Sequence, residues 1–409
     1  MELVIEKRNL GNGLKVVVNE DKYSPMVASA ILYGAGSRTE REGITGISHI
    51  LEHMMFKGTK NLASEDYSKK IQKTGGYDNA YTSKDYTIYY AFLPVDGLET
   101  FLSMEADRMV NLEITDFEEE MEVVKDERRY TTLDNPVECF MEKFWLTLFQ
   151  VHPYRFPVIG FMEDLEKISL HDVLEYYNAL YVPSNAILVV AGGVSPDKVF
   201  SLADKYFGSI IKSSDFNFAN PSEPLQSEKR FLKIKKKYVS PMISLGFKTA
   251  AFGHRHMYAL DVLGEVLCGG KWGVLVRELV YNKGIFTSLN CESSFLKDSG
   301  LFTMVGVPVP GIDIFKAVEI LEKGLWESKD KINIDMVNTA KSKLLTEFFF
   351  NIESVRDVVF ELGEFELCGT AEDINRYPEE LKKVSLGEVT SLFKSYLVEE
   401  RETLGVLYG

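Results

Sequence analysis

Two histidines and a carboxylate lie close together in the segment His49-Ile50-Leu51-Glu52-His53. On a helix, residues four apart lie one turn above each other, so His49 and His53 present two imidazoles to one ion. Glu52 lies close to the same face, where it can polarise a water molecule held by that ion. The chain has only 6 histidines, and two of them fall at this spacing. The segment therefore predicts a metal site that activates water.

A third protein ligand is expected, because catalytic zinc ions usually have three. An acidic segment is the candidate donor: Thr115-Asp116-Phe117-Glu118 reads as a capping box, and it opens a predicted helix running toward Tyr130. Glu120 and Glu127 are seven residues apart and share one face of that helix. Their spacing does not select one over the other. A solvated acidic face is the alternative for this whole segment.

Composition limits the classes of partner. The formal net charge of −15 over 409 residues argues against nucleic acid, because nothing would neutralise phosphates. Acidic groups lining a cavity would instead attract basic peptides. The longest apolar run, at residues 186–191, is too short to span a membrane. No signal peptide is visible, so a cytoplasmic location is expected, although a chain with a removed leader would look the same.

Cysteine usage predicts a reduced protein. The four cysteines are scattered, without a CxxC pair, and a long chain of this kind favours free thiols in the core over a disulfide framework. They are Cys139, Cys268, Cys291 and Cys368.

Strands and helices are predicted in mixed order. Strands are expected at residues 14–18, 26–33 and 186–191, and as a pair between 79 and 93. Helices are expected from near Gly43 to before Lys57, at 64–73, after Asn135-Pro136, and after the capping box Ser169-Leu170-His171-Asp172. This order predicts an α+β fold, in which helices pack on mostly antiparallel sheet.

The chain repeats itself with an offset of 216 residues. Ser24-Pro25-Met26 recurs as Ser240-Pro241-Met242, and residues 168–173 recur at 384–389, again with a capping box. Between the copies, residues 213–226 are polar and lack periodicity. We therefore predict a metal-binding domain at 1–212, a linker at 213–226, and a degenerate second domain at 227–409.

The second copy lacks the ligands of the first. Positions 216 residues after His49, Glu52 and His53 hold, in order, Glu265, Cys268 and Gly269. One half is therefore expected to carry the chemistry, and the other to serve shape, binding or dimerisation.

These motifs resemble the pitrilysin/insulinase family of inverzincins, specifically its branch similar to the mitochondrial processing peptidase. The resemblance spans nearly the full chain and is strongest in the first half. It rests on Gly34-x-Gly36-Ser37-Arg38 with Glu40, on His49 to Thr59, on Gly75-Gly76-x-x-Asn79-Ala80-x-Thr82, and on Glu120 to Glu127. The family has a duplicated α+β domain, in agreement with the repeat.

The resemblance implies a zinc metalloendopeptidase with one Zn²⁺ per chain. By this match His49, His53 and Glu127 are the zinc ligands, and Glu120 is a supporting acidic residue. Glu52 is implied as the general base that activates a zinc-bound water. Asn79 and Ala80 match the edge strand that holds an extended or unfolded peptide by strand addition. For Asn79, a turn-capping role is the alternative.

One departure from the family concerns the second half. Members that work alone carry an Arg and a Tyr there, where this chain has Val274 and Thr287. Arg277 and Tyr281 lie nearby but are displaced by several residues. The resemblance thus implies the catalytic subunit of a heterodimer, whose homologous non-catalytic partner supplies the Arg/Tyr pair; otherwise a homodimer is expected. A catalytically silent structural or assembly subunit is the alternative function.

Overall fold

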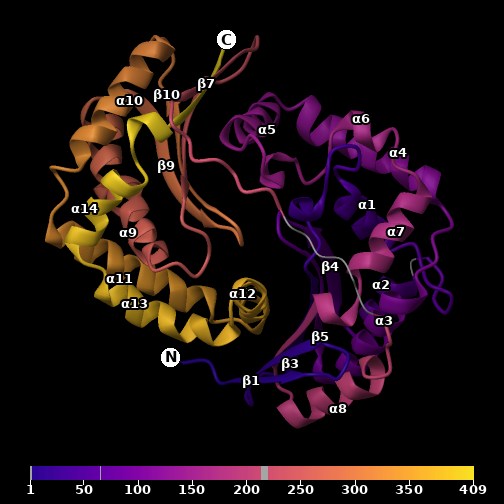
Figure 1. The fold of residues 1–409 in the computed structure, drawn as a ribbon. Coiled ribbons are helices and arrows are strands. Elements are labelled where there is room, and N and C mark those ends of the chain that lie inside the picture. The colour runs from indigo at the N-terminus through magenta and orange to yellow at the C-terminus, as the bar shows by residue number, and fades with distance from the viewer. Residues whose placement is uncertain (1, 65, 213–219) are drawn as a thin grey trace. The chain divides into compact units, whose positions relative to one another are not determined.

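The chain folds into two compact units, each built around its own sheet. The computed structural model describes residues 2–64, 66–212 and 220–409. Unit 1 comprises Met1–Thr131, His152–Pro221 and Asn351–Asn375, and unit 2 comprises Thr132–Val151, Ser222–Phe350 and Arg376–Gly409. Each unit combines a mostly antiparallel sheet with helices (Figure 1), so the predicted α+β fold is confirmed. Residues 213–219 of the predicted linker 213–226 lie outside the described residues.

Unit 1 is centred on a six-stranded sheet with the order β1-β2-β6-β3-β5-β4. Its strands are β1 (Ile5–Asn9), β2 (Lys15–Glu20), β3 (Met26–Tyr33), β4 (Tyr77–Thr82), β5 (Thr87–Pro94) and β6 (Ala186–Gly192). Strands β2 and β6 pair in parallel, and the other pairs are antiparallel. The central strands β3 and β6 are almost wholly buried, as expected for a sheet covered on both faces. Strand β4 forms one edge.

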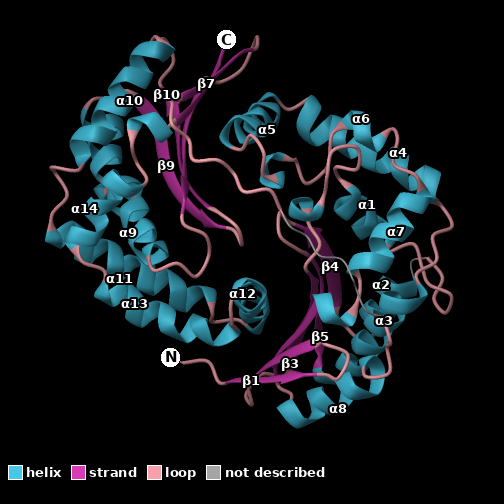
Figure 2. Ribbon diagram, in the orientation of Figure 1, coloured by secondary structure: helices cyan, strands magenta, loops and turns pink. Residues whose placement is uncertain are grey.

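Helices cover both faces of this sheet (Figure 2). The helices of unit 1 are α1 (Ile47–Met54), α2 (Asp66–Lys73), α3 (Leu98–Asn111), α4 (Phe117–Arg128), α6 (Met162–Leu165), α7 (Leu170–Leu180), α8 (Pro196–Phe207) and α12 (Val355–Cys368). Helix α12 lies against β3 and β6 on the face opposite α1 and α3. Its Gly363 permits this approach, because a Cβ there would lie 2.8 Å from Leu32 Cδ1.

Unit 2 is centred on a five-stranded sheet with the order β7-β11-β8-β10-β9. Its strands are β7 (Arg230–Lys235), β8 (Met242–Thr249), β9 (Phe286–Phe295), β10 (Gly300–Pro308) and β11 (Thr403–Tyr408). Its helices are α5 (Pro136–Leu148), α9 (His256–Cys268), α10 (Ile314–Ser328), α11 (Ile334–Asn351), α13 (Tyr377–Lys383) and α14 (Leu386–Ser395). Strand β9 is an edge.

Short helical turns connect the elements of both units. They are η1 (Ser37–Thr39), η2 (Val95–Gly97), η3 (Arg129–Leu133), η4 (Pro153–Arg155), η5 (Pro183–Asn185), η6 (Gly270–Trp272), η7 (Val276–Asn282), η8 (Ala371–Arg376) and η9 (Glu399–Arg401). Within the described part of the chain, every helix is too short or too polar to cross a bilayer.

The two repeats exchange one helix each. Helix α5 lies within the first repeat in sequence but packs on β7, β8 and β11 of unit 2, whereas α12 lies within the second repeat and packs on the sheet of unit 1. The two helices begin at nearly equivalent positions of the 216-residue repeat. Glycines make room for α5: Cβ atoms at Gly246 and Gly405 would lie 2.9 and 2.8 Å from Phe144 ring carbons. The compact units therefore differ from the predicted domains 1–212 and 227–409 by these exchanged segments, and the domain division stays a prediction.

Two predicted capping boxes are confirmed and one is wrong. Ser169 and Ser385 each accept from the N3 amide of their helix, and the N3 carboxylate bonds back to the cap. Helix α4 instead begins at Phe117 with Asp116 as N-cap, and no side chain caps it. Because α4 begins at Phe117, Thr115 lies one residue before the N-cap position. Its hydroxyl therefore cannot reach the first free amides of the helix.

The prediction of free cysteines is wrong for one pair. Cys268 at the end of α9 and Cys291 on β9 form a disulfide, and Cys139 and Cys368 are free. The two bonded residues are 23 apart in sequence. The two cysteines come together because α9 packs across β9. No local sequence motif predicts this packing.

Candidate metal centre

The helix that carries both histidines, α1, is fixed at its start by a buried carboxylate. Its predicted start near Gly43 is four residues early, because Gly43 and Gly46 have φ of 93° and 89°, values that favour glycine and interrupt a helix. Glu40 accepts hydrogen bonds from the amides of Gly46 (2.7 Å) and Ser48 (3.0 Å). An anion here satisfies free amides and complements the helix dipole. Burial raises the pKa of Glu40 to about 7, although the two amide hydrogen bonds act to lower it.

Packing of α1 directs its histidines away from the core. Ile47, Ile50, Leu51 and Met54 are fully buried, whereas the imidazoles of His49 and His53 lie on another face with their ring centroids 4.7 Å apart. The predicted shared face is therefore present.

Glu127 of α4 completes a cluster of three metal-ligating groups. Its Oε2 lies 3.8 Å from His49 Nε2 and 3.3 Å from His53 Nε2, and one ligand atom from each residue falls within 4.8 Å of the others. Ligand atoms about 2.0–2.1 Å from a tetrahedral zinc ion lie roughly 3.3–3.4 Å apart. Two imidazoles and one carboxylate are a donor set used by catalytic zinc sites. The three residues therefore fit a zinc ion.

Glu120 lies behind the cluster, where it contacts a histidine. Its Oε1 is 2.8 Å from His53 Nδ1, and its other oxygen forms an ion pair with Lys57. A carboxylate on the second ring nitrogen fixes the tautomer and the orientation of a metal-ligating histidine. The structure thus separates the two glutamates that spacing left equivalent: Glu127 joins the cluster, and Glu120 holds His53.

The charges around the cluster act differently on its three groups. Burial, and repulsion by His53, lower the pKa of His49 to about 4, so its imidazole is neutral and can donate a lone pair. For His53, burial opposes protonation, but hydrogen bonds with Glu127 and Glu120 raise its pKa. The hydrogen bond with His53 lowers the pKa of Glu127, which is therefore ionised.

Glu52 lies beside the cluster at the wall of a pocket. Burial raises its pKa, and hydrogen bonds from Thr82 oppose this shift. The pocket has a volume of about 510 Å³. It is lined by Glu52, His53, Phe56, Lys57, Ser64, Tyr67, Ser68, Lys69, Gln72 and Glu120. A carboxylate that is hard to ionise, next to a metal-ligating histidine, suits a group that accepts and returns a proton.

Asn79 and Ala80 lie on the edge strand β4, outside the metal cluster. The predicted strand pair between 79 and 93 is confirmed as β4 and β5. The Asn79 side chain accepts from the Ala80 amide (2.9 Å) and donates to the Tyr77 hydroxyl (3.1 Å). The Ala80 amide is therefore satisfied by a side chain rather than by strand β5, as expected for an amide at the free edge of a sheet.

Sequence patterns assign no role to two basic residues near the centre, Lys57 and Arg108. Lys57 lies in the turn after α1 and forms an ion pair with Glu120, a contact that no local pattern signals. Arg108 is 1% exposed, pairs with Glu105, and has its guanidinium 3.9 Å from the Tyr67 ring centroid on the pocket wall. The spacing of three residues between Glu105 and Arg108 on helix α3 was the local signal for this pair.

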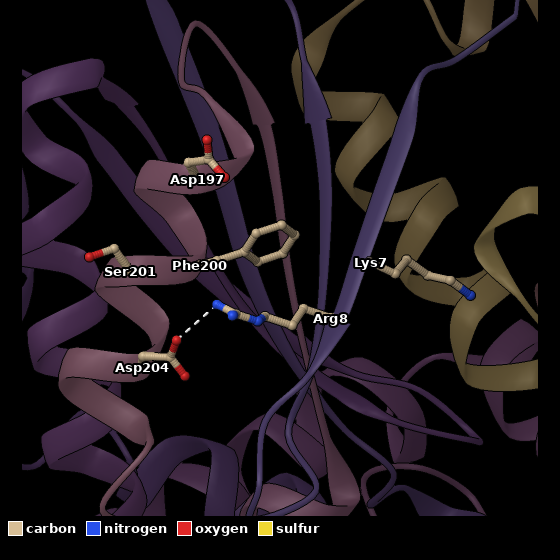
Figure 3. Close-up of a pocket in the computed structure, with 6 residues that line it drawn as sticks. All are labelled: Lys7, Arg8, Asp197, Phe200, Ser201 and Asp204. Atoms are coloured by element: carbon tan, nitrogen blue, oxygen red, sulfur yellow. Dashed lines mark hydrogen bonds and ion pairs between the residues drawn. The ribbon is translucent and has the colours of Figure 1, made fainter.

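A second pocket in unit 1 shows no comparable chemistry. It has a volume of about 410 Å³ and lies between β1 and α8 (Figure 3). Arg8 forms an ion pair with Asp204 (2.9 Å), and its guanidinium lies 5.6 Å from the Phe200 ring centroid. Since its best-placed cation is already paired with a carboxylate, this exposed pocket lacks a focused charge.

Comparisons with known proteins agree with this geometry. The model of the insulinase family (peptidase family M16) matches residues 15–159, and that of the peptidase M16 inactive domain matches residues 167–344. The zinc protease PqqE of Helicobacter pylori is 31% identical to this chain, over 97% of this chain and 91% of that protein. The chain belongs to the insulinase family of peptidases.

Further similarities to M16 proteins extend over the whole chain. The uncharacterized zinc protease YmxG of Bacillus subtilis is 28% identical over 97% of each protein. The crystal structure of a protease from Helicobacter pylori superposes with a TM-score of 0.94 at 29% identity, covering 100% of both chains. Family membership is thus shown, whereas the branch similar to the mitochondrial processing peptidase and the role of catalytic subunit stay predictions.

The segment matched by the M16 inactive domain has Val274 and Thr287 at the two positions where an Arg and a Tyr were expected. Val274 is 3% exposed, and the Thr287 hydroxyl donates to the Val307 carbonyl within the sheet (3.0 Å). Arg277 and Tyr281 lie on η7, where Tyr281 is 57% exposed. Val274 is therefore buried, and the hydroxyl proton of Thr287 is used within the sheet.

Proposed function

We propose that this chain is a zinc-dependent endopeptidase of the M16 family that cleaves extended or unfolded peptides. The observation that carries the proposal is the cluster of His49, His53 and Glu127, with ligand atoms within 4.8 Å of one another and Glu52 beside it. Relatives that have lost activity are expected to lose part of this set. The zinc proteases of Helicobacter pylori and Bacillus subtilis named above support the same reaction class.

Each group in the centre then has a distinct role. His49, His53 and Glu127 would hold one zinc ion, which when bound would supply Lewis-acid chemistry and lower the pKa of water. Glu52 accepts the proton of the attacking water and passes it to the leaving amine. Glu120 keeps His53 Nδ1 occupied, so that Nε2 is the ligating nitrogen.

Strand β4 is the proposed peptide-binding element. Its free edge can pair with an extended peptide, whose backbone would replace the Asn79 side chain at the Ala80 amide. Main-chain pairing of this kind does not depend on particular side chains. The proposed substrates are therefore extended peptides in general, and not peptides with one required side chain.

Two measurements test this function. Purified protein is freed of metal, reconstituted with zinc, and assayed for metal content and for cleavage of an unfolded protein with and without chelator. We expect one zinc per chain, cleavage that the chelator stops, and recovery on adding zinc. A chain that binds no stoichiometric zinc, or cleaves equally well with chelator, would sink the proposal.

We further propose that the active enzyme is a heterodimer. Val274 and Thr287 leave this chain without the Arg/Tyr clamp expected from the family, so a homologous non-catalytic chain would supply it. We expect weak cleavage by this chain alone and strong cleavage after mixing with such a partner. Full activity of a homodimer would refute the heterodimer but not the peptidase. Zinc binding without cleavage, alone or mixed, would favour the silent assembly subunit.

A further inference from the structure

One contact links the proposed general base to the proposed peptide-binding strand. Thr82 is the last residue of β4, and its hydroxyl donates to Glu52 Oε2 over 2.5 Å. The backbone N–H of Thr82 also hydrogen-bonds the Glu52 carboxylate. The same residue therefore holds Glu52 with two donors and ends the strand that carries Ala80.

The neighbouring hydroxyl, that of Thr87, does not take the hydroxyl proton of Thr82. Thr87 faces Thr82 in the β4–β5 register, with their Oγ1 atoms 3.3 Å apart. Thr87 donates its single hydroxyl proton to the Ala35 carbonyl (2.8 Å). Each hydroxyl has one proton to give, so the proton of Thr82 goes to Glu52.

This hydrogen bond limits the orientation of the carboxylate. Threonine is branched at Cβ and has few χ1 rotamers on a strand, and a hydroxyl bond to an ionised carboxylate is short and strong. Because Oε2 is held, proton acceptance falls to Oε1. A general base needs such fixed geometry toward the reacting atoms.

We propose that Thr82 is the positioning residue of Glu52, and that it couples the register of a peptide on β4 to the proton acceptor. A peptide paired with β4 is then fixed relative to Glu52 by one short stretch of backbone. This inference rests on the proposed peptidase function.

Loss of the hydroxyl is compatible with folding. Thr82 is half-buried at the end of an edge strand, so removing its hydroxyl opens no core cavity. Valine has the same branched shape and favours strands. Thr82→Val therefore removes the donated hydroxyl and preserves β4, whereas Thr82→Ser keeps a hydroxyl.

The experiment compares four zinc-loaded proteins: the parent, Thr82→Val, Thr82→Ser and a matched control, Thr370→Val. The Thr370 hydroxyl also donates to a carboxylate, that of Glu372, but lies outside the centre. We expect Thr82→Val to lower kcat roughly tenfold to hundredfold, with KM and zinc content unchanged. Thr82→Ser should restore kcat, and Thr370→Val should match the parent. Thr82→Val with parental kcat, a loss confined to KM, or no rescue by serine overturns the proposal.

A second readout does not depend on activity. In metal-free protein, the infrared carboxylate band of Glu52 is isolated by subtracting the spectrum of Glu52→Gln. We expect this band to shift in Thr82→Val and not in Thr370→Val. An unshifted band overturns the assignment of Thr82. If the parent cleaves no peptide, the proposed peptidase function is refuted. The infrared band then tests by itself whether the Thr82 hydroxyl bonds to Glu52.

Discussion

Helix α1 of unit 1 and helix α9 of unit 2 occupy equivalent places in the repeat, and each packs against an edge strand of its sheet, β4 or β9. In unit 1 the junction is a hydrogen bond from Thr82 to Glu52. In unit 2 the residue equivalent to Glu52 is Cys268, and it is joined to β9 by a disulfide with Cys291. The first junction leaves a carboxylate, the proposed proton acceptor, at this position, whereas the second uses the same position for a covalent bond.

The other two ligand positions have also changed in unit 2. Glu265, equivalent to His49, forms an ion pair with Lys343 (2.8 Å). Gly269, equivalent to His53, lies where a Cβ would be 2.3 Å from the carbonyl oxygen of Glu265. Restoring a histidine there would require the end of α9 to move. Both copies thus keep a helix-to-strand junction, but in unit 2 the positions equivalent to the metal-ligand cluster carry an ion pair, a disulfide and a glycine.

The largest effect is expected at Glu52. Glu52→Gln keeps the shape of the side chain but removes proton acceptance, so cleavage should fall about 10²- to 10⁴-fold with zinc still bound. Glu265→Gln, a carboxylate lost from the equivalent helix of unit 2, should leave kcat unchanged. Peptide cleavage and metal content are measured on both. Equal losses in the two variants would remove the functional difference between the repeats.

The disulfide should matter for stability and not for chemistry. It closes a stretch of 23 residues, which corresponds to about 3 kcal/mol of unfolding free energy. Cys291→Ser should therefore lower the urea midpoint of unit 2 and leave kcat unchanged, with Cys139→Ser as control. Tryptophan fluorescence follows this unit, since Trp145, Trp272 and Trp326 all belong to it. A midpoint equal to that of the control would contradict a stabilising role.

Glu120 should affect zinc affinity more than folding. Glu120→Gln removes the negative charge beside His53 Nδ1 and the ion pair with Lys57. Loss of such a supporting group typically costs about ten- to hundredfold in metal affinity. Competition with a chelator of known affinity measures the change. The control Glu122→Gln removes an exposed carboxylate from the same helix, and a similar loss there would refute a specific role for Glu120.

The smallest effect concerns a buried acid in unit 2. Burial raises the pKa of Asp261 to about 7, although the Tyr377 hydroxyl donates to it (2.8 Å). The folded chain therefore holds this proton between about pH 4 and 7, and stability falls as pH rises through that window. Asp261→Asn never ionises, so it should be more stable than the parent at pH 8, where ionisation of the buried Asp261 destabilises the parent, and not at pH 4.

Glu40 is the control for this comparison of stability at pH 8 and pH 4. Its pKa is also raised to about 7 by burial, but its two oxygens accept amides at the start of α1. Glu40→Gln loses one of these acceptors, so it should not gain stability at pH 8. A gain in both variants would mean that the buried charge, and not the helix cap, dominates at Glu40.

Local sequence patterns were sufficient to predict the helix that carries the two histidines and most strands of the sheet beneath it. Spacing of four placed His49 and His53 on one face, and apolar runs located β3, β5 and β6. The repeat was visible because its capping boxes and turns depend on neighbouring residues alone. The start of α1 was misplaced, since a glycine at positive φ is not distinguishable in sequence from any other glycine.

Tertiary packing decided what the sequence left open. Glu120 and Glu127 share a helix face, and only the docking of α4 against α1 brings the second to both histidines and the first to His53 Nδ1. The bond between Cys268 and Cys291 and the exchange of α5 and α12 also depend on contacts between distant segments. No periodicity encodes which sheet a helix covers.

The exchanged helices constrain how the protein is made. The sheet of unit 1 remains uncovered on one face until α12 (Val355–Cys368) has been synthesised, close to the end of a 409-residue chain. Helix α5, although made early, has no sheet to cover until β8 and β11 exist. Unit 1 therefore cannot finish folding on the ribosome before the chain has been made as far as α12. A nascent chain interrupted between the repeats would yield neither unit.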